Sequence, residues 1–181
     1  VDLGKQADLE RIVDDIRHGR LELGGAERRL RAVESEPPRS AWFRITPVVF
    51  ISAAAAQFLG GGLAEIVVAA SAGAFIGVLE ELAARRGSRD RLVPPASATS
   101  VAFGVAAIAM LWPDLFPPVA LVASLIVLVP GLEFTLAIKE ISTENLVAGS
   151  ARLTSAIGDF LLLAFGVALG TQFAAAAFGP A

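Results

Sequence analysis

The sequence predicts an all-α integral membrane protein with five transmembrane helices, and three observations support this fold class. Hydrophobic residues make up 55% of the 181-residue chain and charged residues only 18%, with a mean hydropathy of +0.65. The apolar residues stand in long uncharged blocks rather than at the helical or strand spacing that leaves one face polar. The Lys and Arg residues all fall before the first block or in every second connection between blocks. A soluble five-helix bundle built from these blocks would have no polar faces to present to water.

The uncharged blocks are the predicted spans, because a helix needs about 20 largely apolar residues to cross the hydrocarbon core of a bilayer. Four blocks are long enough on their own, and the second is adequate if its flanking Glu65 and Glu80 lie at the two interfaces. None lies at the extreme N-terminus, so none is interpreted as a signal peptide. The blocks cover residues 45–64, 66–79, 92–113, 115–132 and 160–181.

The basic residues predict the orientation, since Lys and Arg accumulate on the cytoplasmic side of membrane proteins. All 15 of them precede the first span, lie between spans two and three, or lie between spans four and five. We therefore expect a multi-pass protein of the cell inner (cytoplasmic) membrane, with the N-terminus in the cytoplasm and the C-terminus outside. The net charge of -3 and the absence of a basic binding face argue against a nucleic-acid partner.

The chain is predicted to consist of a cytoplasmic helical segment, residues 1–41, and a five-helix transmembrane module, residues 42–181. Apolar residues recur at helical spacing as far as Ile16, and Gly24-Gly25 is expected to separate this helix from a second over about residues 26–33. Forty residues rarely build a core that folds alone. The segment is therefore expected to pack on the cytoplasmic mouth or on a partner, or to be the remnant of a larger domain.

The chain carries little that enzymatic chemistry could use, and we expect no catalytic residue, no metal site and no cofactor. Cysteine is absent, which excludes disulfides, thiolate metal sites and cysteine nucleophiles. The single histidine, His18, lies in a charged segment and is expected to be a solvated residue at a helix end. Gly60-Gly61-Gly62 is expected to be a tight turn between spans one and two rather than a phosphate loop. An intramembrane enzyme using Glu133 and Asp159 as a carboxylate pair is the weakest hypothesis.

Residues 129–160 are the most informative stretch. An apolar run is broken at Pro130-Gly131, and charged residues follow at once. Charges at membrane depth are costly and usually face a cavity or a partner charge, and transporters use such helix breaks to line binding sites. The candidate substrate-binding or proton-coupling residues are Pro130, Gly131, Glu133, Arg152 and Asp159.

Two interpretations of these charges remain open. In the functional one, Glu133 and Asp159 take up protons or face the substrate, and Arg152 anchors a carboxylate or acts as counter-charge. In the structural one, residues 139–152 form a cytoplasmic loop with solvated charges, and Arg152 is a positive-inside anchor. The loop is the favoured interpretation for Lys139, Glu140 and Glu144. A substrate hydroxyl could be recognised by Ser124, Thr135, Ser142, Thr154 or none of them.

The order of these short motifs resembles the threonine/serine exporter family across nearly the whole chain. The resemblance rests on Pro130-Gly131, Ala137-Ile138-Lys139-Glu140, Gly149 with Arg152-Leu153, Ala156, and a last helix carrying Gly166 and Gly170. The opening residues 1–5, the helix pair ending at Leu30 and the run 42–62 also look like the N-terminal module of that family. The chain departs from the family pattern at Lys139-Glu140, where the family tends to have Asp.

The resemblance implies a secondary transporter that exports threonine or serine, driven by the proton motive force. Family members usually carry two five-helix modules, so the resemblance implies that this chain works with a second five-helix module or as a homo-oligomer. The split members are similar to dicarboxylate exporters, so a succinate exporter half is one alternative. The other is a non-transporting membrane scaffold or sensor whose cytoplasmic helices bind a partner. The expected partners are thus a small-molecule substrate, the lipid bilayer and a second module.

Overall fold

The computed structural model describes residues 11–18, 24–25, 28–30, 40–86 and 92–179, and the chain divides into two compact units, Val1–Arg39 and Ser40–Ala181. In the first unit, residues 11–17 are helical and the exposed His18 closes that helix through Asp14, as expected. The expectation that Gly24-Gly25 separates two helices is wrong, because both residues are helical. A glycine inside a helix costs only about 1 kcal/mol, which other contacts can offset. Residues 26–27 and 31–33 of the expected second helix lie outside the described residues.

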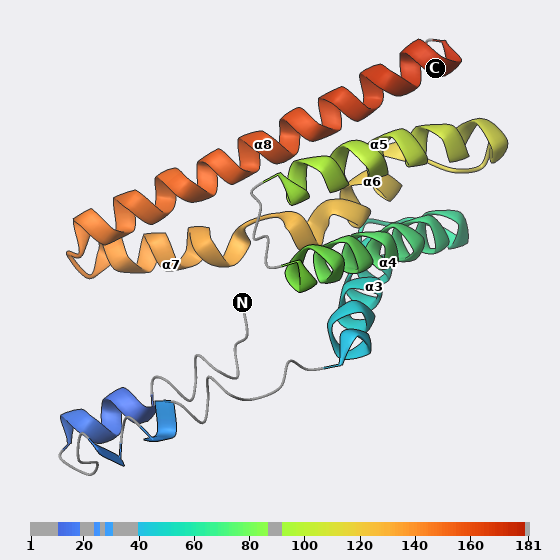
Figure 1. Cartoon of the computed structure of the whole chain (residues 1–181). Coiled ribbons are helices and arrows are strands. Elements are labelled where there is room, and N and C mark those ends of the chain that lie inside the picture. Colours follow the sequence, from blue (N-terminus) through green and yellow to red (C-terminus); the bar gives the residue numbers. More distant parts are fainter. Residues whose placement is uncertain (1–10, 19–23, 26–27, 31–39, 87–91, 180–181) are drawn as a thin grey trace. The chain divides into compact units, whose positions relative to one another are not determined.

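The second unit consists of helices, and no strand occurs in its described residues (Figure 1). In chain order they are α3 (Ala41–Phe58), α4 (Leu63–Arg85), α5 (Val93–Leu111), α6 (Pro117–Leu125), the 3-10 helix η1 (Ile126–Leu128), α7 (Gly131–Ser142) and α8 (Leu146–Phe178).

The membrane-spanning class that the sequence predicts is confirmed by the lengths and compositions of these helices. In the described part of the chain, α3, α4, α5 and α8 are each long and apolar enough to cross a bilayer. The α6–η1 segment together with α7 would make a fifth span, but the two halves are bent by 56°. At 1.5 Å per residue, the 33 residues of α8 extend about 50 Å, well beyond the hydrocarbon thickness of about 30 Å.

Helices α3 and α4 form an antiparallel pair whose backbones approach closely. A Cβ added at Gly73 would lie 2.7 Å from Ser52 Oγ and 3.0 Å from the carbonyl oxygen of Val48, and one added at Gly77 would meet Ile45 at 3.3 Å. Small residues permit such approach where lipid supplies no hydrophobic drive. The turn between the helices contains Gly60 at φ +80°, a left-handed conformation that glycine adopts without strain. The predicted tight turn is confirmed.

Helices α5 and α8 run side by side in the same direction (Figure 1). Gly166 packs on Pro95 at the start of α5, Gly170 on Thr99 one turn further, and the rings of Phe103 and Phe178 lie 5.7 Å apart. Two helices that run parallel must be joined by a connection that returns to the starting side. Here α6, η1 and α7 provide that connection.

The unit therefore has two distinct ends. We call the end that carries the α3–α4 turn, the α5–α6 connection and the C-terminal end of α8 the turn end. We call the opposite end, which carries Arg44, Arg85 and Arg86, the arginine end. Trp42 and Trp112 lie at these opposite ends and are partly exposed, as expected of interfacial anchors. Pairs of prolines begin α5 and α6, where a missing N–H costs little.

Candidate functional site

The fourth predicted span is interrupted at the expected place. The 3-10 turn η1 ends at Leu128, Val129 is extended, and α7 begins at Gly131 after Pro130. The Gly131 N–H donates to the carbonyl of Val129 at 2.7 Å, and the next helical bond runs from the Phe134 N–H to the carbonyl of Pro130 at 3.1 Å. The backbone N–H groups between these two bonds have no partner within α7, as at any helix N-terminus. The break thus presents free backbone donors and the positive end of the α7 dipole.

The charged stretch that follows is a helical hairpin, so the interpretation of residues 139–152 as a loop is wrong as regards their secondary structure. Helix α7 continues to Ser142, and α8 begins at Leu146 after a connection that contains Glu144 at φ 63°. The two helices pack because Gly149 fits against α7. A Cβ added there would lie 2.6 Å from Ile141 Cγ1 and 3.0 Å from the carbonyl oxygen of Ala137. Sequence reasoning missed the hairpin because it weighed the charges and not this glycine contact.

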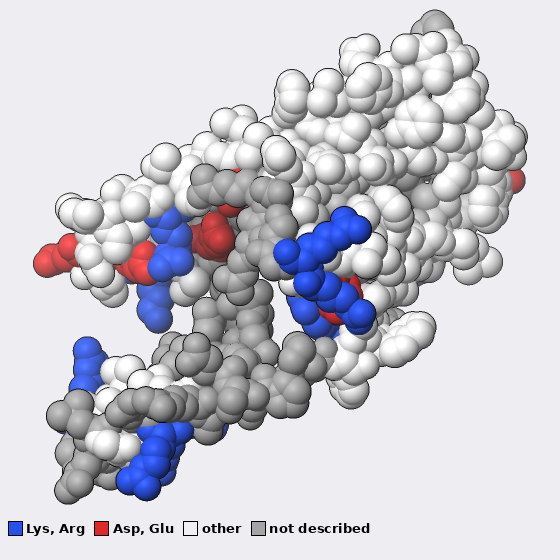
Figure 2. All heavy atoms as spheres, in the orientation of Figure 1, with Lys and Arg blue, Asp and Glu red and all other residues white. Residues whose placement is uncertain are grey.

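We call α7 together with residues 146–165 of α8 the arm, because this part of α8 precedes the contact of Gly166 with the start of α5. At 1.5 Å per residue, those 20 residues extend about 30 Å. Figure 2 shows that charged side chains gather on the arm and at the arginine end, whereas most of the visible face between the arm and the turn end is uncharged. Much of the charge that the sequence seemed to place at membrane depth is therefore on the arm.

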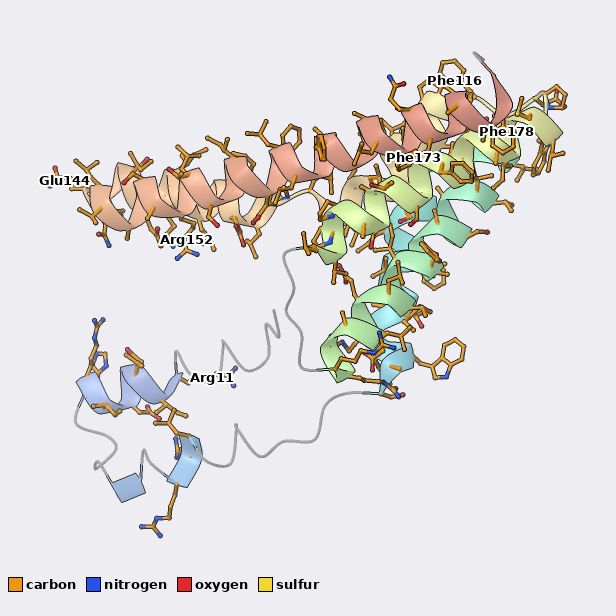
Figure 3. The ribbon with its side chains drawn as sticks, turned by 45° about the horizontal axis from the view of Figure 1, so that its top comes forward. Arg11, Phe116, Glu144, Arg152, Phe173 and Phe178 are labelled. Carbon is orange, nitrogen blue, oxygen red and sulfur yellow. The ribbon has the colours of Figure 1, made fainter. Side chains whose placement is uncertain are left out.

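Arg152 is held by a bidentate ion pair across the arm. Its Nε donates to Glu140 Oε2 at 3.1 Å and its Nη2 to Oε1 at 3.0 Å. Paired parallel bonds of this kind fix the orientation of both groups. The side chains are 41% and 26% exposed, so water screens the pair. Figure 3 shows Arg152 on α8 in the arm, and in this conformation its guanidinium is engaged with Glu140.

Asp159 lies level with the helix break, and Glu133 about one turn away. The hairpin is antiparallel, and Gly149 meets Ala137 and Ile141. Asp159 lies ten residues after Gly149 on α8. Because the helices are antiparallel, the matching level on α7 lies ten residues before the segment from Ala137 to Ile141, which is the helix break. Both carboxylates are half-buried, and neither makes a hydrogen bond or ion pair with the described residues. Of the predicted residues, Pro130 and Gly131 form the break, Glu133 lies in the first turn of α7, and Asp159 is level with the break along the hairpin.

The four hydroxyls considered for substrate recognition are all engaged within their own helices. Each donates to the carbonyl four residues earlier, with Ser124 fully buried and the other three exposed. The pairs are Ser124 with Ala120, Thr135 with Gly131, Ser142 with Ile138 and Thr154 with Ser150. Of these, Thr135 is the one beside the break.

Two other hydroxyls, which the sequence did not single out, are buried without a partner. Ser52 and Ser97 are fully buried in α3 and α5, and neither Oγ has a hydrogen-bond partner in the described residues. An unpartnered buried hydroxyl costs about 1–3 kcal/mol. Gly73 leaves room for the Ser52 side chain. This relation could not be predicted, because the sequence does not reveal that α3 and α4 pack with these two residues in contact.

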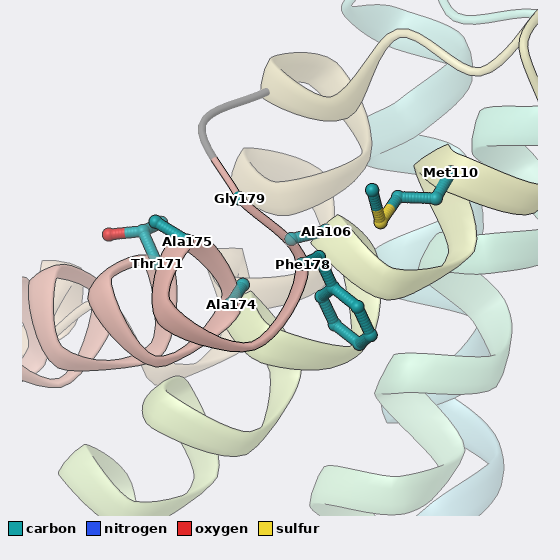
Figure 4. A pocket seen from close by; sticks show the side chains of 7 residues that line it. All are labelled: Ala106, Met110, Thr171, Ala174, Ala175, Phe178 and Gly179. Carbon is teal, nitrogen blue, oxygen red and sulfur yellow. The ribbon is translucent and has the colours of Figure 1, made fainter.

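An apolar recess of about 170 Å³ lies between α5 and α8 at the turn end (Figure 4). Its one polar side chain, Thr171, donates to its own helix at Val167 and Ala168. A charged or zwitterionic ligand would find no partner there. The lining residues are Ala106, Met110, Thr171, Ala174, Ala175, Phe178 and Gly179. In the described part of the chain, no three acidic or histidine side chains converge as metal ligands would.

Comparison with known proteins identifies the family. The family model ThrE, described as "Putative threonine/serine exporter", matches residues 1–174. Comparison with curated proteins and with solved structures gave no match. The family match covers nearly the whole chain and agrees with the apolar helices and the broken span. The chain belongs to the threonine/serine exporter family of membrane proteins.

Proposed function

We propose that this chain is the membrane module of a secondary transporter that exports threonine or serine in exchange for protons. Family membership supports the exporter class and the substrate type. The proposed orientation puts the arginine end and the arm on the cytoplasmic side of the inner membrane, and the turn end outside. This arrangement follows the positive-inside tendency, because Arg44, Arg85 and Arg86 lie at one end of the helices.

The observation that carries the proposal is the break between η1 and α7. A helix that begins after such a break leaves backbone donors free at its N-terminus, and donors of this kind suit a carboxylate. An amino acid also carries an ammonium group, which requires acceptors. The half-buried carboxylates of Glu133 and Asp159 lie within about one helical turn of the break along the hairpin, and neither makes a hydrogen bond or ion pair with the described residues. The break thus offers groups for both ends of a zwitterion.

In this proposal Gly131 and the first turn of α7 receive the substrate carboxylate, and Pro130 keeps the helix from closing. Asp159 binds the ammonium group and exchanges it for a proton, with Glu133 as the neighbouring acceptor. Arg152 leaves Glu140 when substrate arrives and steers its carboxylate to the break. Substrate and proton would then favour different conformations, which is the condition for coupling.

Transport needs a second polypeptide in this proposal, either another five-helix module or a second copy of this chain. The support comes from the exposed residues around the break. Leu132, Ile138 and Phe160 are 55%, 60% and 47% exposed beside the charged residues of the arm. A site that must exclude water requires a cover over such a surface.

Counterflow in proteoliposomes tests the function. Vesicles are loaded with unlabelled threonine, serine or succinate, and uptake of the same labelled compound is followed, with and without a co-expressed five-helix partner. Accumulation of labelled threonine or serine is expected. Accumulation of succinate alone would move the chain to the dicarboxylate class. If the protein elutes as a single folded species and no labelled compound accumulates under any of these conditions, the result would contradict transport and favour a scaffold.

A further inference from the structure

The arm is attached to the bundle mainly through one helix. Helix α7 packs substantially on α8 alone among the described helices. Helix α8 enters the bundle at Leu163, which is buried in the same core cluster as Ala98 of α5. One turn later Gly166 meets Pro95, near the start of α5. Because α5 and α8 run in the same direction, the residues of α8 before Leu163 extend past the start of α5, and the arm projects from the bundle (Figure 1).

One glycine of α8 has no close neighbour. The helix contains four glycines, at positions 149, 158, 166 and 170. At Gly149, Gly166 and Gly170 an added Cβ would collide with a neighbouring helix, whereas at Gly158 it would meet nothing within 4 Å. Packing therefore does not require a glycine at position 158, and a glycine inside a helix is destabilising relative to alanine. What Gly158 supplies is freedom of the backbone.

Gly158 lies level with the helix break on the other side of the hairpin. Gly149 of α8 contacts Ala137 and Ile141 of α7. Gly158 is nine residues further along α8, and Pro130 is nine residues before the middle of that contact on α7. The two helices are antiparallel and rise by the same 1.5 Å per residue, so both positions lie at about the same height. A single plane across the arm thus contains the broken helix and the open glycine.

Both connections in this plane are easily bent. On the α7 side, Val129 is extended and the helical hydrogen bonds begin only at the carbonyl of Pro130, so none of them crosses the break. On the α8 side the helix is continuous, and Gly158 lacks the Cβ that restricts the backbone elsewhere. Sharp bends in helices occur at such glycines and at interruptions of the hydrogen-bond ladder. Beyond the plane, the Gly149 contact and the ion pair of Arg152 hold α7 and α8 together as one piece.

We propose that the arm swings as a lever on a hinge made of Gly158 and residues 129–131. From Gly158 to Leu146, α8 extends about 18 Å, so a bend of about 20° moves the tip of the arm by about 6 Å. The first turn of α7 turns with the arm, whereas Asp159 lies on the bundle side of the hinge. The swing therefore turns the free backbone donors of the break relative to the Asp159 carboxylate. Its consequence for substrate binding rests on the proposed function, but the movement itself does not.

Distances between paired spin labels test the movement, and the absence of cysteine allows labels to be introduced at chosen positions. Phe43→Cys in α3 and Val147→Cys at the tip of the arm are both exposed, and together they report on the arm against the bundle. Leu132→Cys with Val147→Cys places both labels in the arm and is the reference pair. In lipid nanodiscs, the first pair should give a broad or two-peaked distribution of distances, and the reference pair a single narrow one.

Gly158→Ala stiffens the hinge without contacting a neighbour. Alanine favours the helical backbone more than glycine does, and this difference should lower the bent fraction about fivefold. Gly104→Ala is the matched control, because Gly104 also lies inside a helix, α5, and an added Cβ there meets nothing within 4 Å. It should leave the distribution of distances unchanged. Amide hydrogen exchange at residues 158–162, whose helical N–H groups bond across Gly158, should slow by a similar factor in Gly158→Ala and not in Gly104→Ala.

The hinge would be overturned if the first pair gave a distribution as narrow as that of the reference pair. It would also be overturned if Gly158→Ala left the distances and the amide exchange as Gly104→Ala leaves them. Counterflow separates this inference from the proposed function. A swinging arm in a chain that shows no counterflow would support the hinge and contradict the proposed transport, whereas counterflow with a fixed arm would do the reverse.

Discussion

The bundle, which consists of α3, α4, α5, α6 and residues 166–178 of α8, and the arm are both held together by helix contacts, but the kinds of contact differ. In the bundle, Gly73, Gly166 and Gly170 allow backbones to meet, so packing extends along whole helices. In the arm, α7 contacts α8 around Gly149, and one water-exposed ion pair reinforces that contact. Small residues stabilise helix pairs where lipid surrounds them, whereas charged pairs suit a region in contact with water. The two regions also differ in their neighbours, because α7 packs substantially on α8 alone among the described helices, whereas α6 in the bundle packs on α3, α4 and α5.

The largest effect is expected from Gly170→Ala, which adds a methyl group against the carbonyl oxygen of Thr99 and 2.7 Å from the Cβ of Ala102. Because the backbone of α5 or of α8 must move, we expect the free energy of unfolding to fall by about 2–3 kcal/mol. Thermal unfolding in detergent measures it. Gly158→Ala is the control, since the added group there meets nothing within 4 Å. Equal melting temperatures for the two variants would contradict close packing of α5 on α8.

Gly73→Ala should be the next most destabilising change, and we expect it to lower the free energy of unfolding by about 1–2 kcal/mol. The new methyl group would lie 2.7 Å from Ser52 Oγ. Because removing the Ser52 side chain makes room, the double variant with Ser52→Gly should recover part of the loss. The same melting assay reports both. A double variant no more stable than Gly73→Ala alone would show that the clash lies elsewhere.

Ser97→Ala should raise stability, by about 1 kcal/mol, because it removes a buried hydroxyl that has no partner in the described residues. Ser124→Ala is the comparison, since that hydroxyl is equally buried but donates to the carbonyl of Ala120 at 2.6 Å. Its removal should be neutral or slightly destabilising. If Ser97→Ala lowers the melting temperature as much as Ser124→Ala or more, the hydroxyl has a partner after all.

The smallest effect is expected in the arm. Arg152→Ala removes the pair with Glu140, which is partly exposed and screened by water, so it should lower the free energy of unfolding only slightly. Global melting should hardly change, while amide hydrogen exchange in α7 should become faster. Lys139→Ala is the control, because Lys139 is exposed on the same helix. Unchanged exchange in α7 for Arg152→Ala would mean that the ion pair does not hold the arm.

Much of the fold could be predicted from the sequence because uncharged blocks and basic connections report directly on membrane crossing. The break at Pro130-Gly131 could be predicted because it depends on two adjacent residues inside an apolar run. The hairpin could not, since charges between Lys139 and Arg152 resemble a loop until Gly149 is seen to face α7. The hydrogen bond from the Phe116 N–H to the buried Glu65 carboxylate was also hidden, because the two residues lie 51 positions apart in the sequence. Features that depend on tertiary pairing leave little trace in a single sequence.

The most direct test of the account is proton-coupled threonine efflux compared between the parent chain and Asp159→Asn. Vesicles loaded with labelled threonine, prepared with the required second module, receive a pH gradient that is acidic outside. The parent should release threonine faster with the gradient than without it. Asp159→Asn, folded by the same melting criterion, should show no response. Equal acceleration in both proteins would contradict the assignment of coupling to the helix break.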